Sequence, residues 1–335
     1  MNLLLRLFYE SGLLARLIRA EPNQLTALSY HRIDDPFRSG FDTYRPNVSA
    51  TPAGFQKQME YIRRYYNVVT CEQLARWLKG RSQLPPRAAV ISFDDGYADN
   101  LLLAHPVLRE LDIPATIFLS TNIIGNEIPF YWDHAAYCFS HTRKDSANLP
   151  LMGQASWSDE ISRELVMNRW FRGVKPLPDI QRLHVLESLA SELDVSIPAG
   201  AFSGLYLNWD QVRELSRNGI EMGAHTASHV ILTRIPLEQA EAEVTQSKQR
   251  IEAEIGKPVN SFAYPNGAAS DYSPEVMGML RKVGIEVAFT LLPGPVRYGT
   301  VRKSPLAIRR VFLGYSDSFP RFVAKLAGFA RLALS

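Results

Sequence analysis

Cysteine is scarce in this chain of 335 residues, which contains only Cys71 and Cys138. Two cysteines provide neither a disulfide framework nor a Cys-x-x-Cys metal motif. A disulfide-rich secreted scaffold is therefore excluded. The low count favours the cytosol, so we expect a cytoplasmic protein, and it leaves a periplasmic location open.

Long apolar runs are also absent: no stretch reaches the roughly 18 residues of a transmembrane helix. The leucine-rich segment from Met1 to Ala20 is interrupted by Arg6 and Glu10 and lacks a clear small-residue cleavage site, so we expect no secretory signal there. Helical periodicity places apolar residues on one face near each end of the chain, at Leu3, Leu7, Leu14 and Ile18, and at Phe322, Leu326, Phe329 and Ala333.

Basic side chains accompany both apolar faces, so residues 1–23 and 317–335 are predicted to be basic amphipathic segments. Such segments can rest on an anionic membrane, which would place the protein peripherally at the inner membrane. They can equally pack on the protein's own core. The sequence leaves both interpretations open.

No segment concentrates positive charge. The chain has 37 basic and 34 acidic residues, a formal net charge of +3, and the basic residues are spread along its length. Proteins that bind nucleic acid carry a basic patch or stripe instead. We therefore expect no nucleic-acid partner.

Strand-like and helix-like segments alternate along most of the chain. Apolar runs at 25–30, 88–93, 115–119, 259–264 and 286–291 are separated by helical patterns such as 51–66, 99–111, 236–255 and 274–283. This alternation predicts an α/β fold with a parallel barrel over residues 24–316. The rhythm breaks at about 122–208, where helix-like stretches lack interleaved strands, so a mostly helical insertion is expected there.

The strand-like run 88–93 ends at two adjacent carboxylates, Asp94 and Asp95, followed by Gly96. Because side chains alternate across a strand, neighbouring acids at its end point in different directions. One acid can then hold a metal ion while the other handles a proton. Taken alone, the motif is equally typical of an acidic turn.

A second motif, Gly223 to His229, follows the strand-like segment 220–222 and contains two histidines four positions apart. On a helical turn, His225 and His229 would face the same way and could bind one cation through neutral ring nitrogens. Surface or core histidines would also explain the pair. Its occurrence together with two aspartates at a strand end favours a three-ligand metal site with room for water.

These motifs resemble those of a known family. Ser92 to Gly96 and His225 to His229 resemble the first two signature motifs of the polysaccharide deacetylases, also called the NodB-homology family or carbohydrate esterase family four. The stretch Phe262 to Gly267 resembles the third motif of the exopolysaccharide branch. Ser29 to Arg32 resembles the opening of the poly-N-acetylglucosamine deacetylases. The resemblance covers about residues 25–311 and implies a distorted (β/α) barrel.

The resemblance also implies an activity, the metal-dependent removal of an N-acetyl group from an amino-sugar glycan. A divalent cation, for which zinc is well suited and cobalt or nickel are compatible, would be held by Asp95, His225 and His229. Asp94 would be the general base, and His31 would protonate the leaving amine. Substrate contacts, including a backbone N–H for the oxyanion, would come from Tyr264, Pro265 and Asn266.

Some positions depart from the family pattern. The third-motif arginine that orients the base is replaced by Ala263, so Arg309 or Arg310 is the candidate substitute, and we take Arg310 as the site residue. A plain surface ion pair is the alternative. The proline expected after the second histidine is Val230, and the C-terminal histidine motif is missing. Both departures fit the branch whose acid lies early in the sequence, and both also fit a loss of activity.

Aromatic residues are frequent in the expected insertion, and most of these rings are predicted to form its own small core. Trp132 and Asp133, the nearest to the barrel, are taken as substrate contacts. Two alternatives to the deacetylase remain at this point. One is a deacylase or deformylase of a polyprenyl-linked sugar at the membrane face, and the other is a non-catalytic carbohydrate-binding relic.

Overall fold

The structure is a computed structural model that describes residues 3–177 and 179–329. Its chain forms two compact units. The barrel unit contains the chain up to Asp35, then Asn47–Gly125, and the part from Gly204 onwards; the helical unit contains Pro36–Pro46 and Asn126–Ser203. The predicted insertion at 122–208 overlaps the longer segment of the helical unit, which also includes a short stretch from before the first motif.

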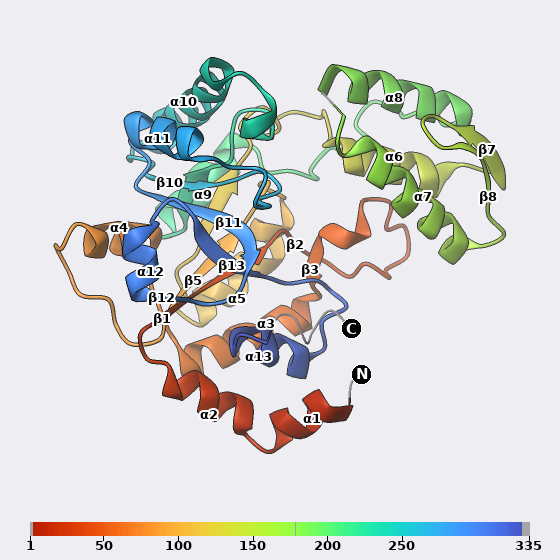
Figure 1. Ribbon diagram of the computed structural model, residues 1–335. Coiled ribbons are helices and arrows are strands. Elements are labelled where there is room, and N and C mark those ends of the chain that lie inside the picture. The colour runs from red at the N-terminus through yellow and green to blue at the C-terminus, as the bar shows by residue number, and fades with distance from the viewer. Residues whose placement is uncertain (1–2, 178, 330–335) are drawn as a thin grey trace. The chain divides into compact units, whose positions relative to one another are not determined.

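Within the described chain, seven parallel strands close a barrel (Figure 1). Their order around the barrel is β1, β13, β11, β10, β9, β6 and β5, and β5 pairs with β1 to complete the circle. The strands are β1 (Gln24–Tyr30), β5 (Ala88–Phe93), β6 (Thr116–Leu119), β9 (Glu221–Ala224), β10 (Ser261–Ala263), β11 (Val287–Pro293) and β13 (Ile308–Phe312). The predicted α/β barrel is confirmed.

Short strands supplement the barrel. β4 (Asn67–Val68) lies parallel beside β5, and β12 (Val296–Arg297) lies antiparallel beside β1. A separate parallel pair joins β2 (Arg32–Ile33) to β3 (Val48–Ala50). Because β2 begins directly after His31, its pairing with β3 fixes the chain just beyond the end of β1.

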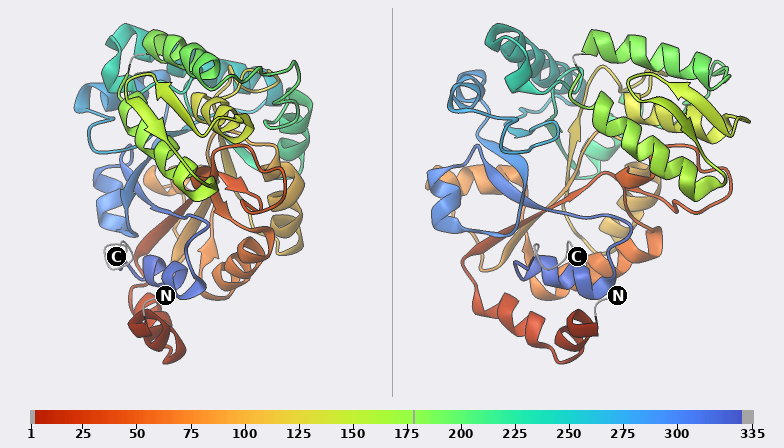
Figure 2. Two further views of the ribbon diagram at one scale, coloured as in Figure 1. Left: turned by 90° about the vertical axis from the view of Figure 1, so that its right-hand side faces the viewer. Right: turned by 45° about the vertical axis from the view of Figure 1, so that its right-hand side comes forward.

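Helices surround the barrel (Figure 2). They are α1 (Leu3–Glu10), α2 (Leu13–Ala20), α3 (Pro52–Tyr65), α4 (Cys71–Leu78), α5 (His105–Glu110), α9 (Trp209–Arg217), α10 (Leu237–Ile255), α11 (Pro274–Val283), α12 (Tyr298–Lys303) and α13 (Phe319–Leu326). Single turns of other helical types lie at Arg45–Asn47, Asn100–Ala104 and Leu232–Arg234, the second of them a π-helical turn directly before α5. The start of α3 shows why the boundaries were predictable, since Thr51 caps it by accepting the N–H of Gly54 and Pro52 occupies the first turn.

Alternation along the strands sorts side chains into two environments. Leu28, Ile91 and Val311 belong to the core beneath the helices, whereas Ala27, Val90 and Ile308 on the same three strands belong to a second core within the barrel. Further along the inward faces of the same strands, the residues become polar: Ser29 on β1, Ser92 on β5 and Arg310 on β13 are buried and joined by hydrogen bonds to Asp94 or to one another. The carboxyl end of the barrel interior is therefore the polar end, where barrel enzymes carry their sites.

The helical unit consists of α6 (Tyr131–His141), α7 (Glu160–Val174) and α8 (Asp179–Glu192). It also contains an antiparallel hairpin that was not predicted, formed by β7 (Ser146–Leu149) and β8 (Gly153–Ser156). Trp157 and Trp170 are buried in this unit, and each indole N–H donates to a backbone carbonyl, that of Lys144 and Pro150 respectively. The expectation that most of its rings form its own core is confirmed for these two residues.

The N-terminal segment is not one helix with one apolar face. α1 and α2 are separated at Gly12, whose φ is +71°. Leu14 and Ile18 are buried in the core, while Leu7 is 51% exposed, so the predicted common face of these residues is wrong. At the other end, Phe322 and Leu326 of α13 are buried in the same core, beside α1 and α2 (Figure 1).

Three members of the two predicted faces remain. Phe329 is half-buried against the core. The side chain of Leu3 and the whole of Ala333 lie outside the described part of the chain. Among the helices of residues 3–177 and 179–329, none combines the length and apolar character needed to cross a bilayer.

Candidate metal centre and active site

Strand β5 places two carboxylates at the carboxyl end of the barrel. Asp94 continues the inward face of Val90 and Ser92, and Asp95 follows in a left-handed turn with φ +75°. Gly96 continues this turn at φ +80°, where a Cβ atom would lie 2.7 Å from Ile124 Cδ1. The glycine is thus required by both conformation and space. Both aspartates are almost completely buried, as expected of groups with a specific role rather than of an acidic surface turn.

The histidine motif follows β9 as a loop, so the expected helical turn is wrong. Thr226 and His229 both have left-handed backbones, with φ of +64° and +60°. Such conformations cost about 1–3 kcal/mol each and cluster at functional sites. The loop nevertheless brings both rings to one acid: His225 Nε2 and His229 Nε2 lie 3.5 Å and 3.4 Å from Asp95 Oδ1.

This cluster has the properties of a metal site. One ligand atom from each of Asp95, His225 and His229 lies within 4.8 Å of the others. Asp95 Oδ1 is buried without a hydrogen-bond partner in the described chain. Two ligands about 2.0–2.1 Å from a tetrahedral zinc ion would be about 3.4 Å apart, close to the observed spacing. The three residues therefore fit a divalent cation.

Surrounding contacts prepare the ligands. His225 Nδ1 lies 2.6 Å from the Ala263 carbonyl, an acceptor, so Nδ1 is the nitrogen that donates there, and Nε2 is the nitrogen directed at Asp95. Burial would raise the pKa of Asp95, but the close contact with His225 and the electrostatic attraction of His31 and His229 outweigh this effect, and the pKa is lowered. The carboxyl group is therefore ionised, as a metal ligand must be.

Asp94 is held by Arg310, whose Nη1 and Nη2 each donate to one carboxylate oxygen at 2.7 Å. Arg310 is fully buried, and its Nε donates to the Thr290 carbonyl. Burial tends to raise the pKa of Asp94, but the guanidinium charge and its hydrogen bonds bring it well below the usual value. Arg309, the other candidate from the sequence, is exposed.

His31 also reaches this site from the end of β1, with its Nε2 atom 4.0 Å from Asp95 Oδ2. Its backbone is fixed on both sides: the N–H donates to Ser49 Oγ, and the carbonyl accepts from Asn100 Nδ2. Its side chain is 14% exposed, so the imidazole can meet a substrate at the mouth of the barrel. His31 is not one of the three clustered ligands and is available for proton transfer.

The third motif contributes backbone rather than ring atoms. The Tyr264 side chain is buried beneath the helices, packs on Tyr272 and donates its hydroxyl to the Leu306 carbonyl. It therefore points away from the ligands, and a substrate contact through this ring does not fit its position. Pro265 is buried, and Asn266, with φ +60°, is partly exposed. The substrate-binding roles of these two residues stay predictions.

Trp132 and Asp133 lie in the helical unit. Trp132 is buried and stacks on Phe130 with ring centroids 4.4 Å apart. Asp133 is fully buried, and its Oδ1 accepts the N–H of Tyr44. Both residues thus have structural contacts inside their own unit, and their predicted contact with substrate stays a prediction.

Glu243 was not identified from the sequence. It lies on α10, and its carboxylate accepts the Ser228 N–H at 2.9 Å and the Ser228 hydroxyl at 2.7 Å. Its backbone carbonyl also accepts the N–H of Ala227. Three hydrogen bonds therefore hold the loop just before His229. No local motif marks Glu243, since it is one of several acids on a helix with charged neighbours.

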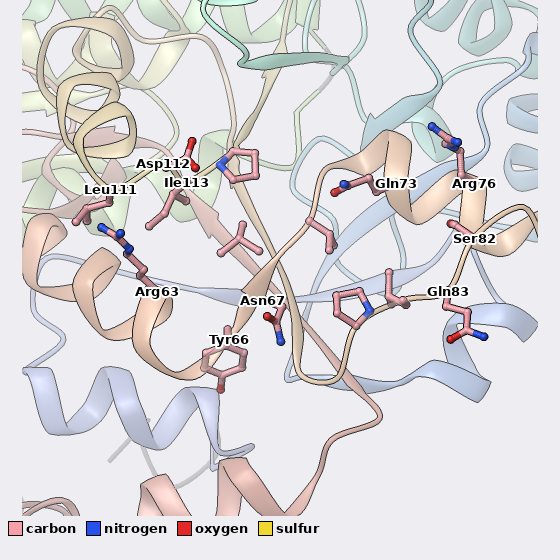
Figure 3. Close-up of a pocket in the computed structure, with 15 residues that line it drawn as sticks. Arg63, Tyr66, Asn67, Gln73, Arg76, Ser82, Gln83, Leu111, Asp112 and Ile113 are labelled. Carbon is pink, nitrogen blue, oxygen red and sulfur yellow. The ribbon is translucent and has the colours of Figure 1, made fainter.

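A hollow of about 620 Å³ lies elsewhere, at the amino ends of strands β5 and β6 (Figure 3). The residues around it include Arg63, Arg76 and Gln83, and none of the candidate catalytic or metal-binding residues lines it. Since Asp94 and Asp95 follow the carboxyl end of β5, this hollow lies at the opposite end of the barrel from the candidate metal ligands Asp95, His225 and His229.

Comparisons with known proteins agree with this site. The model of the family described as "Polysaccharide deacetylase" matches residues 81–288. A poly-beta-1,6-N-acetyl-D-glucosamine N-deacetylase of Staphylococcus epidermidis is 32% identical over 118 residues, which are 32% of this chain and 40% of the relative. The match thus spans less than half of that relative's length.

Two solved structures share the fold. The Streptococcus pyogenes deacetylase PplD, in complex with acetate, has a TM-score of 0.60 at 16% identity, covering 91% of this chain and 99% of its own. IcaB from Ammonifex degensii has a TM-score of 0.56 at 19% identity, covering 91% and 97%.

Proposed function

The chain belongs to the polysaccharide deacetylase family, and we propose that it hydrolyses the N-acetyl groups of an amino-sugar polymer or its glycan precursor. The observation that carries this proposal is the pairing of Asp94 with Arg310 beside the cluster of Asp95, His225 and His229. The name of the staphylococcal relative supports β-1,6-linked N-acetylglucosamine as the substrate class.

We propose that Asp95, His225 and His229 hold the family's divalent cation. Nitrogen and oxygen ligands suit zinc and are compatible with cobalt or nickel. When bound, such a cation lowers the pKa of water and polarises a carbonyl oxygen. The chemistry of the chain's own residues can then be assigned from their positions.

Asp94 is proposed to take a proton from the attacking water. Its two oxygens are fixed by Arg310, and Ser29 Oγ donates to Oδ2 at 3.3 Å, so the carboxylate keeps one orientation. Its lowered pKa ensures that it is ionised at neutral pH. Because a low pKa also makes a weak base, its contribution depends on being held in place next to the water rather than on basicity.

The Asn266 N–H is proposed to stabilise the oxyanion. In the turn of the third motif, Tyr264 N–H donates to the Phe289 carbonyl and Gly267 N–H donates to the Pro265 carbonyl. Proline has no N–H. The Asn266 N–H is the one left without a partner in the described chain, three residues beyond the carbonyl that orients His225. A free backbone donor beside the reacting carbon is what a tetrahedral oxyanion requires.

His31 is proposed to act last. As the tetrahedral carbon collapses, the C–N bond breaks and the nitrogen takes a proton from the imidazole, which releases the free amino sugar and acetate. The proton removed by Asp94 returns to solvent and His31 regains a proton from solvent, so both side chains are restored and the overall reaction is hydrolysis.

The experiment compares wild type with Asp94→Asn. Protein loaded with zinc, cobalt or nickel is incubated with β-1,6-linked N-acetylglucosamine oligomers and with polyprenyl-linked amino sugars, and released acetate and formate are measured. Loss of the base should reduce acetate release about 10²- to 10⁴-fold while bound metal stays constant. Equal release by the two proteins would refute the assignment. Formate release would identify the deformylase alternative, and glycan binding without any turnover would identify the relic.

We also propose that the protein contacts an anionic membrane surface. Leu7 on α1 and Leu13 and Leu17 on α2 are 51%, 40% and 37% exposed, and the exposed Arg16 lies on the same turn as the last two. Apolar side chains next to a cation suit the headgroup region of an anionic bilayer. We propose a peripheral location at the inner membrane, on its cytoplasmic face, and the small number of cysteines is compatible with the periplasmic face as well.

A further inference from the structure

Phe312 lies at the mouth of the barrel. It is the last residue of β13, and alternation puts it on the same face as Ile308 and Arg310. Ile308 is in the interior core and Arg310 binds Asp94, so the face that carries Phe312 is the inward one. Each step from Ile308 to Arg310 to Phe312 moves one level towards the carboxyl end. The phenyl ring thus follows directly above the residue that holds the general base.

Phe312 also borders the proposed acid. In the parallel pairing of β1 with β13, Phe312 is opposite Ser29, and His31 comes two residues after Ser29, directly beyond the end of β1. The rings of His31 and Phe312 meet edge to face, with centroids 5.7 Å apart and planes at 75°. A group that packs against the phenyl ring is therefore also next to the imidazole.

The exposure of this ring is unusual. Phe312 is 39% exposed, while the other phenylalanines on the barrel strands, Phe93, Phe118, Phe262 and Phe289, are at most 1% exposed. An apolar ring left open to solvent at the rim of a polar site has no role in the core. Ring faces of this kind pack well on the C–H face of a pyranose, and sugar sites combine such walls with a few fixed polar groups.

We infer that Phe312 is the apolar wall of a sugar subsite, against which a pyranose ring of the glycan packs so that the leaving nitrogen is presented to His31. This inference rests on the proposed function, because it names the side chain that recognises the glycan of that reaction. Phe312 is a substrate-positioning residue and takes no part in proton transfer.

The test separates recognition of sugar from chemistry. Wild type, Phe312→Ala, Phe312→Leu and Phe312→Trp are assayed on a β-1,6-linked N-acetylglucosamine pentasaccharide and on 4-nitrophenyl acetate, which has no sugar ring and a leaving group that needs no acid. Leu102→Ala, a change at an exposed apolar residue of the π-helical turn, is the matched control. The affinity of each metal-loaded protein for the pentasaccharide is measured by calorimetry as a readout independent of turnover.

Phe312→Ala should raise KM and Kd for the pentasaccharide about five- to tenfold, with kcat and the ester reaction changed less than about twofold. Phe312→Trp should behave like wild type, and Phe312→Leu should resemble the alanine variant because it lacks a flat ring. Unchanged KM and Kd, equal losses on both substrates, or a wild-type-like Phe312→Leu would overturn the inference. If no variant or wild type hydrolyses the glycan, the proposed function fails while the calorimetric comparison still decides the role of Phe312.

Discussion

Arg310 and Asp94 are separated by 216 positions in the sequence, yet each carboxylate oxygen of Asp94 accepts a 2.7 Å hydrogen bond from the Arg310 guanidinium. The barrel brings them together because β5 and β13 both flank β1, and Ala27 of β1 is level with Val90 on one side and with Arg310 on the other. The proposed base is therefore oriented by an arginine on the last strand of the barrel, and not by one in the third motif, where this chain has Ala263.

Replacing Arg310 should affect both stability and pH dependence. In Arg310→Met the buried Asp94 carboxylate loses its partner, which should lower the free energy of unfolding by about 3–5 kcal/mol at neutral pH. Without the guanidinium, only the weaker attraction of His225 and His31 opposes burial, so the pKa of Asp94 rises and the active, ionised form appears only at higher pH. The acid limb of the pH–rate profile should therefore move upward, and Arg310→Lys should show a smaller shift because it keeps the charge but not the bidentate contact. Urea unfolding and pH–rate measurements check both effects, and an unmoved acid limb would contradict the assigned pairing.

Glu243 should influence metal affinity without touching the metal. Its carboxylate fixes Ser228, next to the left-handed His229, so Glu243→Ala should free the loop and weaken zinc binding by about 10- to 100-fold. Competition with a chelator of known affinity measures the change. Glu241→Ala removes an exposed acid from the same helix and serves as the control. Equal zinc affinity in both variants would show that the loop keeps its shape without this brace.

The exposed leucines of the N-terminal helices should bind anionic vesicles. Wild type should float with phosphatidylglycerol vesicles at low salt and release as salt is added, since charge and apolar insertion act together. The double variant Leu13→Gln, Leu17→Gln should float much less, whereas Leu102→Gln, at an exposed position elsewhere, should behave like wild type. Flotation that is the same for all three proteins, or that does not depend on anionic lipid, would remove the proposed membrane partner.

Local signals in the sequence, together with the resemblance of its motifs to a known family, were enough to predict the barrel and the residues that cluster in it. Strand endings at Asp94 and Asp95, and a second strand ending before His225, place polar side chains at the carboxyl edge of a parallel sheet. Parallel strands carry these ends to one side, so the convergence of acid and imidazoles follows from topology. The helical periodicity of the chain between the strands predicted most of the surrounding helices for the same reason, since a 3.6-residue repeat is a local property.

Some features that depend on contacts between distant residues, or on one unusual backbone angle, were not predicted from the sequence. The histidine spacing suggested a helical turn, but the left-handed residues Thr226 and His229 form a loop that depends on Glu243 for support. Likewise, the apolar pattern of the N-terminal segment predicted one common helical face. In the structure the chain turns at Gly12, so Leu14 is buried while Leu7 is exposed. In each case a tertiary contact or a single backbone angle decided the outcome, and neither is encoded in periodicity.

His31 should matter for amides and much less for activated esters. An amine leaves only after it is protonated, so His31→Gln should lower kcat on N-acetylglucosamine oligomers by about 10²- to 10⁴-fold. The 4-nitrophenolate of 4-nitrophenyl acetate departs with its own negative charge, so hydrolysis of that ester should fall less than about tenfold. Zinc content should be unchanged, because His31 Nε2 lies 4.0 Å from Asp95 Oδ2 and outside the cluster of three ligands. Parallel assays on the two substrates, with metal analysis of each preparation, distinguish an acid from a ligand: equal losses on both substrates together with lost zinc would identify His31 as part of the metal site instead.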